Sequence, residues 1–156
     1  MSGTLLFCFL IGCAVGLRSL TAPAAICWGA HLGWLQFGGT KLAFIEHRAI
    51  LILFTLLALV ELVSDKLPKT PARTKGPGLI ARILFGAFCG AALAVSAGGN
   101  ILLAAVIGIA GALAGTFGGY HLRHALVVKA HLPDFVVALA EDAVAIVGSL
   151  LIVSHL

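Results

Sequence analysis

Carboxylates inside apolar stretches are the residues of this sequence that are best suited to do chemistry. Glu61 lies about 9 Å inside one hydrophobic segment, and Glu141 lies about equally deep in another, at 1.5 Å of helix rise per residue. Asp65 follows Glu61 by one helical turn, and Asp142 follows Glu141 directly. A charge in a bilayer is costly, so such a group must pair, take up a proton or face water. These acids are therefore candidates for exchanging a proton or for holding a cation or a polar headgroup.

Basic residues accompany these acids. Arg18 follows the first apolar stretch, Lys66 follows Asp65, and Arg82 lies in the next apolar segment. Seven residues are therefore candidates for binding a substrate or an ion: Arg18, Glu61, Asp65, Lys66, Arg82, Glu141 and Asp142. Salt bridges that only lock helices together would produce the same pattern, and both interpretations stay open at this point.

A second tier of candidates lies near the end of a glycine-rich segment. His121 and His124 are one helical turn apart and flank Arg123. Two histidines together with an acid can ligate a metal, but this spacing is common by chance. We therefore expect no metal site and no cofactor, and we assign no catalytic residue. Neither a phosphate-binding loop nor the motif of a serine nucleophile is present.

The composition places the whole chain in a membrane. Of the 156 residues, 61% are hydrophobic and 10% are charged, whereas about 25% are charged in ordinary globular domains. The length allows a single integral membrane domain over residues 1–156, with the lipid bilayer as its main partner. The net charge of +4 is explained by the basic residues that orient membrane proteins, so we expect no nucleic-acid partner.

Six hydrophobic segments predict an all-α, polytopic bundle of transmembrane helices. They cover residues 4–17, 24–37, 49–67, 78–97, 101–119 and 135–154. Pro23 is expected to break the helix between the first two, but these two could also form one long kinked helix, which would leave five segments. Proline also ends the third segment, because Pro68 disfavours helix in the residue before it.

The distribution of basic residues favours six segments with both termini outside the cell. In this topology only Lys41 and Arg48 lie at the outer face, and the other basic residues lie at the cytoplasmic face, as the positive-inside rule requires. The cytoplasmic set is Arg18, Lys66, Lys69, Arg73, Lys75, Arg82, Arg123 and Lys129. We expect the basic, proline-rich loop at residues 66–78 to meet anionic headgroups.

Glycines spaced four residues apart predict closely packed helices. Small residues at this spacing let helix backbones approach in a bilayer, an arrangement that we call glycine-zipper packing. The spacing occurs at Gly12 and Gly16, at Gly86 and Gly90, and at Gly111, Gly115 and Gly119. Contacts within the chain are the favoured interpretation. A homodimer through the Gly111, Gly115 and Gly119 stripe is the alternative.

Three motifs together resemble a known family. They lie at residues 16–23, 61–68 and 139–142, and the most specific is Glu-x3-Asp-Lys-x-Pro at residues 61–68. In this order and spacing they resemble the bacterial membrane family catalogued as domain of unknown function 4126, over essentially the whole chain. The matching positions are Arg18, Glu61, Asp65, Lys66, Pro68, Glu141 and Asp142. The resemblance implies an integral membrane protein of bacteria and brings no activity with it.

Three functions fit these residues. The favoured one is a multi-pass protein of the bacterial inner membrane that transports a small polar or ionic solute through a cytoplasm-facing cluster of carboxylates and arginines. The second is a structural or assembly role, in which the charges only hold helices together. The third is a membrane-embedded enzyme that acts on a lipid headgroup, and the lack of a dense aspartate motif argues against this function. The solute itself stays unknown.

Overall fold

The computed structural model describes residues 2–66 and 74–156 of the chain. Within these residues all regular secondary structure is helical. Short 3₁₀ and π segments lie at Ala43–Glu46 and Ala125–Lys129. The α-helices are α1 (Ser2–Leu17), α2 (Thr21–His31), α3 (Arg48–Ser64), α4 (Gly76–Ser96), α5 (Ile101–His124) and α6 (Asp134–Ser154).

Three of these helical stretches are long and apolar enough to cross a membrane. They are Gly76–Ser96, Ile101–Lys129 and Asp134–Ser154, and the apolar helix Gly3–Leu17 is shorter. Large hydrophobic side chains cover the outside of the bundle, and Leu102, for example, is 77% exposed. In water this surface would be a contiguous apolar patch of the kind that soluble proteins avoid, whereas lipid chains can cover it. The fold is therefore that of a helical membrane protein.

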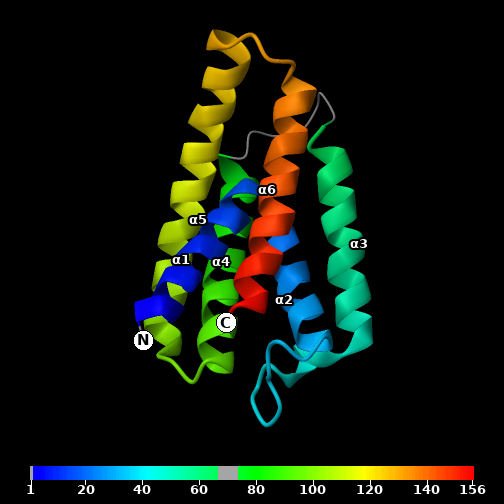
Figure 1. The fold of residues 1–156 in the computed structure, drawn as a ribbon, viewed down its shortest axis with the longest axis vertical. Helices are drawn as coiled ribbons and strands as arrows, with labels where there is room; N and C mark the ends of the chain where they lie inside the picture. Colours follow the sequence, from blue (N-terminus) through cyan, green and yellow to red (C-terminus); the bar gives the residue numbers. More distant parts are fainter. Residues whose placement is uncertain (1, 67–73) are drawn as a thin grey trace.

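The first two helices form a hairpin within the bundle. Figure 1 shows α1 rising from the end that holds the N-terminus, and α2 running back toward the same end. At 1.5 Å per residue, the 16 residues of α1 extend about 24 Å and the 11 residues of α2 about 17 Å. Both lengths are below the hydrocarbon thickness of about 30 Å, so the tip of this hairpin lies beside the longer helices and not beyond them.

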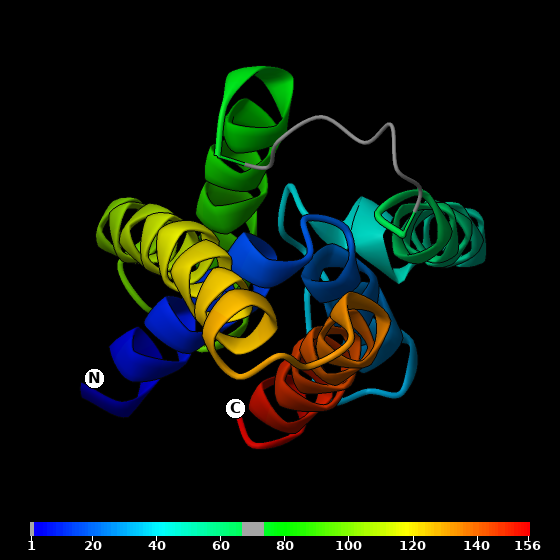
Figure 2. The ribbon, with the colours of Figure 1, turned by 90° about the horizontal axis from the view of Figure 1, so that it is seen from above.

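The remaining helices surround this hairpin. α1 contacts α4, α5 and α6, while α2 contacts α6 and α3. Figure 2 shows α3 at the edge of the bundle, with α2 between it and α1. The buried core is built mainly from small or β-branched side chains where α1, α2, α4 and α5 meet, such as Val15, Ala22, Ile26, Ala92 and Ala112.

The prediction for the second segment is wrong at both ends. The predicted segment covers residues 24–37, whereas α2 covers Thr21–His31. Pro23 does not break the helix because it lies in the first turn, where a backbone N–H has no partner within the helix. The helix ends before Gly33, whose φ of +78° is a left-handed conformation that favours glycine. α1 and α2 are thus two helices and not one kinked helix.

The other segments agree better with the prediction, with one further exception. The fifth was expected to end at residue 119, but α5 runs to His124 and continues as π-helix to Lys129. The polar residues at this end therefore extend the helix. The fourth and sixth helices match residues 78–97 and 135–154 within two residues. The third was expected to end at residue 67, and α3 ends at Ser64. Most of the loop at residues 66–78, including Pro68, lies outside the described residues.

Several glycines lie where two helix backbones touch. A Cβ atom on Gly111 would lie 2.1 Å from the backbone oxygen of Phe9 in α1, and one on Gly115 would lie 2.2 Å from that of Cys13. α4 approaches α5 in the same way, since a Cβ on Gly90 would lie 2.3 Å from the oxygen of Ala104. The faces of Gly111 and Gly115 are thus covered by α1 within one chain. The homodimer through these glycines and Gly119 stays a prediction.

Candidate functional site

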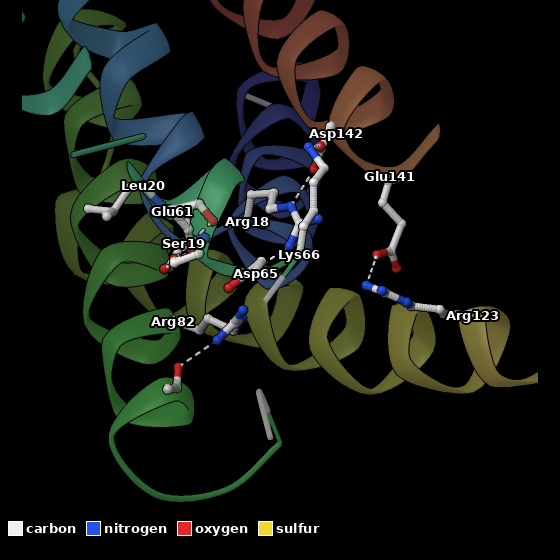
Figure 3. A network of polar contacts seen from close by, with 12 residues as sticks. Arg18, Ser19, Leu20, Glu61, Asp65, Lys66, Arg82, Arg123, Glu141 and Asp142 are labelled. Carbon is white, nitrogen blue, oxygen red and sulfur yellow. Dashed lines mark hydrogen bonds and ion pairs between the residues drawn. The ribbon is translucent and has the colours of Figure 1, made fainter. Parts of the chain in front are cut away.

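Charged side chains in or next to α3, α4 and α6 meet Arg18 at the tip of the α1–α2 hairpin (Figure 3). We call this group the hairpin-tip network. It contains six of the seven residues predicted from the sequence and one more, Ser19. Its members are Arg18, Ser19, Glu61, Asp65, Lys66, Arg82 and Asp142.

Arg18 is the centre of the ion pairs. Its side chain is 1% exposed, and its Nε donates to Oδ1 of Asp142 at 2.6 Å. Its Nη1 donates to Oδ2 of Asp65. Lys66 Nζ reaches the other oxygen of Asp142 at 2.8 Å. A buried charge is tolerated only with such partners, so Arg18 connects the hairpin tip to both α3 and α6.

Glu61 binds the backbone that begins α2. Its Oε1 accepts from the N–H of Ser19 and its Oε2 from the N–H of Leu20, both at 2.8 Å. The Ser19 hydroxyl also donates to Oε1. Leu20 is the residue that caps α2, and its own side chain forms no capping hydrogen bond. A carboxylate is well placed here because a helix N-terminus carries a partial positive charge. Glu61 in α3 thus accepts hydrogen bonds from backbone N–H groups at the start of α2, a role that the side chain of the capping residue itself usually has.

Arg82 binds the backbone that ends α1. Its Nε donates to the carbonyl oxygen of Gly16 at 3.1 Å, and its Nη1 donates to Gly78 at 2.9 Å. The hydroxyl of Thr116 in α5 also reaches the Gly16 oxygen, at 3.4 Å. In a continuous helix this oxygen would accept from the N–H of Leu20. Both halves of that missing hydrogen bond are therefore satisfied by side chains from other helices, Arg82 on one side and Glu61 on the other.

The network balances its charges inside the bundle. Three cationic side chains, Arg18, Lys66 and Arg82, accompany three carboxylates, from Glu61, Asp65 and Asp142. Glu61 is 8% exposed and Arg82 is 4% exposed, so both lie largely out of contact with solvent. Chemically, such a network can exchange partners: a proton or a solute charge that engages one member would release its present partner.

Glu141 belongs to a second cluster. Arg123 Nη1 donates to Oε2 of Glu141 at 3.3 Å, and Arg123 also forms two hydrogen bonds of 2.8 Å with Asp134. Neighbouring helix residues point about 100° apart, which is why Glu141 and Asp142 reach different partners. Figure 3 shows Glu141 turned toward Arg123 and away from Arg18. The adjacent acid pair therefore does not act as one unit, and Glu61 and Glu141 have separate partners.

Of the second-tier candidates, Arg123 forms ion pairs. Among the described residues, no ion pair involves His121 or His124. His121 and His124 are exposed on α5, and the His121 ring lies edge-on to Tyr120 with 5.5 Å between ring centroids. Within residues 2–66 and 74–156, no group of three or more His, Cys, Asp or Glu side chains is arranged to hold a metal ion.

Two polar residues of the site were missed by the sequence reasoning. Ser19 and Thr116 are both buried; Ser19 lies in the break between α1 and α2, and Thr116 contacts it. Ser19 adjoins Arg18 in the motif at residues 16–23, so its position was a usable signal. Thr116 carried no such signal, because a lone threonine in a glycine-rich helix usually bonds to its own backbone, as Thr116 also does to Ala112 at 2.7 Å.

Comparisons with known proteins give one match. A family model with the description "Domain of unknown function (DUF4126)" matches residues 5–155, nearly the whole chain. No curated protein and no solved structure matches the chain.

Proposed function

Because the chain belongs to the family described as domain of unknown function DUF4126, a family without an assigned activity, we propose a function from the site itself. The protein is a small membrane carrier for a polar or ionic solute, and the hairpin-tip network is its gate. The observation that carries this proposal is the pair of side chains, Glu61 and Arg82, that replaces one helix hydrogen bond at the break between α1 and α2.

Helix breaks of this kind support a transport role. Non-helical backbone is tolerated inside a membrane where it is buried in protein or lines a path for a solute. In many transporters two half-helices meet near the middle of the membrane, and their ends bind the charged groups of the substrate or a coupling ion. Here the end of α1 presents a carbonyl oxygen, and the start of α2 presents two N–H groups. Both kinds of ligand for a small ionic solute are thus available.

The side chains that bind these backbone groups occupy the positions that the solute would take. The carboxylate of Glu61 occupies the N–H groups of Ser19 and Leu20, which would also bind a carboxylate or another anion of the solute. Protonation of Glu61 would weaken its hold on them, because a neutral acid is a poorer acceptor. Arg18 couples the same tip to α3 and α6, so a change of partner there would move helices relative to one another.

We place the protein in the bacterial inner membrane with the network near the cytoplasm. Lys66 follows α3, Lys75 precedes α4, and Lys129 ends the π-helical extension of α5. These helix ends lie on the network's side of the bundle, whereas α3 begins at Arg48 at the opposite end, after the segment that contains Lys41 (Figure 1). This bias favours a cytoplasmic position for the network's side. In this orientation the N-terminus and the end of α6 both face outward, and α1 and α2 count as two short segments of six.

The test compares Glu61→Gln with the wild-type protein in proteoliposomes. Currents across a solid-supported membrane are recorded for a panel of amino acids, small organic acids and inorganic ions, at neutral and acidic pH. The account predicts a current for at least one solute that is lost in Glu61→Gln while the variant stays folded in detergent. Asp134→Asn is the matched control, because it makes the same kind of change in the exposed ion pair with Arg123 and should keep the current. Equal currents in wild type and Glu61→Gln would contradict the proposal.

A structural role is the second candidate, and the burial of Arg18 favours it. A network of buried ion pairs can simply hold the hairpin against α3 and α6. Under this function Glu61→Gln lowers the unfolding temperature clearly, and no solute of the panel gives a current with the wild-type protein. Measurements of current and of unfolding temperature on the same samples therefore distinguish the carrier function from the structural role.

A further inference from the structure

An apolar groove lies between α2, α3 and α6, and one of its ends adjoins the hairpin-tip network. Its volume is about 340 Å³, and its lining includes Ala25, Leu59 and Leu150. One hydrogen bond crosses it, from Trp28 Nε1 to Thr55 Oγ1 at 3.2 Å. An apolar protein cavity of about 150 Å³ already admits benzene, so this groove has room for a longer hydrocarbon.

One end of the groove leads to charged side chains. Leu62 and Ile146 line the groove. Lys66 comes four residues after Leu62, just beyond α3, and Asp142 comes four residues before Ile146 in α6. Residues four apart share a helix face, so the ion pair between Lys66 and Asp142 lies one turn beyond the apolar lining. The groove is therefore apolar along its length and polar at one end, the pattern that fits an amphiphile.

Thr21 marks the polar end of the groove. It lines the groove and is 6% exposed, and its hydroxyl has no hydrogen-bond partner among the described residues. Buried polar groups normally have partners, and a hydroxyl can donate one hydrogen bond. A ligand with acceptor atoms at this end would give the Thr21 hydroxyl a partner.

We propose that the groove binds a single-chain fatty acid, with its hydrocarbon chain along the apolar lining and its carboxyl group at Thr21. The carboxyl oxygens would accept from the Thr21 hydroxyl. A fatty alcohol offers fewer acceptors, and a phospholipid has a second chain and a large headgroup that stays at the membrane surface. This site does not depend on the proposed carrier function, since it uses other residues and a different ligand.

The two tryptophans of the chain make the site directly measurable. Trp28 and Trp34 are the only tryptophans in the sequence, and both line the groove. The purified full-length protein in delipidated detergent micelles is titrated with dibromostearic acid, whose bromine atoms quench tryptophan fluorescence at contact. Unlabelled stearic acid, its methyl ester and a phosphatidylcholine then compete. We expect saturable quenching that stearic acid reverses at lower concentration than the ester or the phospholipid.

Thr21→Val distinguishes the proposed contact from general partitioning into the groove. Valine keeps the shape but removes the hydroxyl, so binding of dibromostearic acid should weaken about threefold to tenfold, the value of one hydrogen bond. The unfolding temperature should stay equal or rise, since the hydroxyl has no partner to lose. Ser149→Ala is the control, because Ser149 is also buried and unpartnered in the described structure but is not part of the lining.

Two results would overturn the inference. The first is quenching that never saturates and depends only on the bromine content of the micelle, with no competition by stearic acid. The second is competition by the ester or the phospholipid equal to that by stearic acid, with Thr21→Val unchanged in affinity. Neither result depends on any solute current.

Discussion

Arg18 ties together three parts of the chain that are far apart in sequence. It precedes α2, and its guanidinium reaches Asp65 after α3 and Asp142 in the middle of α6. Two nitrogens of one rigid, planar group donate to two different carboxylates, which a lysine ammonium cannot reproduce with the same geometry. The position of the hairpin tip therefore depends on the shape of the arginine side chain as well as on its charge.

Replacing Arg18 by lysine tests this dependence on shape. The variant Arg18→Lys keeps the charge but loses at least one charged hydrogen bond, so the free energy of unfolding should fall by about 1.5–3 kcal/mol. Denaturation in mixed detergent micelles measures it. Arg48→Lys makes the same exchange at an exposed residue near the other end and should change the stability by less than about 0.5 kcal/mol. Equal stability of Arg18→Lys and wild type would contradict the geometry of the site.

At the level of residues, the charges could be predicted and their partners only in part. The cost of a charge in lipid was enough to single out Arg18, Glu61 and Asp142. It could not tell that Glu61 would bind backbone N–H groups, because this requires knowing that the helix breaks between residues 17 and 21. It also could not separate Glu141 from Asp142, because this depends on how α6 is rotated about its axis.

Among the helices, the contacts at glycines decide how closely α1, α4 and α5 approach. Backbone oxygens of α1 lie where the side chains of Gly111 and Gly115 would be, and α4 and α5 meet in the same way at Gly86 and Gly108. In lipid these contacts are favourable mainly through dispersion, since burying apolar surface gains little over contact with lipid chains. Close approach of α5 to α1 also brings Thr116 to the carbonyl oxygen of Gly16.

Alanine substitutions in α5 test these contacts. In Gly111→Ala the new methyl group would overlap the backbone of Phe9, so α1 has to shift, and we expect a loss of about 1–3 kcal/mol in unfolding free energy. Gly118→Ala is the matched control on the same helix. Nothing lies within 4 Å of a Cβ at Gly118, so the higher helix propensity of alanine should leave the stability equal or raise it by up to about 1 kcal/mol. The reverse order of stabilities would refute this packing.

At the level of helices, the length of the apolar stretches predicted the elements well, whereas prolines and polar residues predicted the helix ends less well. The apolar segments at residues 78–97 and 135–154 became α4 and α6 with nearly the same bounds. Pro23 was misleading, because a proline in a first turn is compatible with helix. The polar residues after position 119 were also misleading, since in α5 they simply extend the helix past the apolar stretch.

For the whole molecule, one end of the bundle gathers most of the charge. The hairpin-tip network and the Arg123 cluster lie toward the same end, and the turn at residues 97–100 and the segment at residues 32–47 lie at the other (Figure 1). The outer surface between these ends is apolar. We propose that this division orients the molecule in a bilayer, with its more basic end at the cytoplasmic side.

Cysteine labelling in intact cells tests this orientation. Lys41 and Lys129 are both exposed, one near each end. Lys41→Cys should react with a membrane-impermeant maleimide added outside, and Lys129→Cys should react only after the cells are permeabilised. The wild-type protein is the control, because Cys8, Cys27 and Cys89 are buried and Cys13 is partly buried, so its labelling should be low. Labelling of Lys129→Cys from outside would reverse the proposed topology.

The coupling between Arg18 and Asp142 tests most directly whether charges from distant helices meet at the hairpin tip. The free energy of unfolding is measured for the wild-type protein, Arg18→Met, Asp142→Leu and the double variant in mixed micelles. Each single change removes one partner from a buried charge and should cost about 3–5 kcal/mol. The double variant should then be more stable than the sum of the two losses predicts, by at least about 1 kcal/mol. Losses that add within about 0.5 kcal/mol would contradict the contact and the site that is built on it.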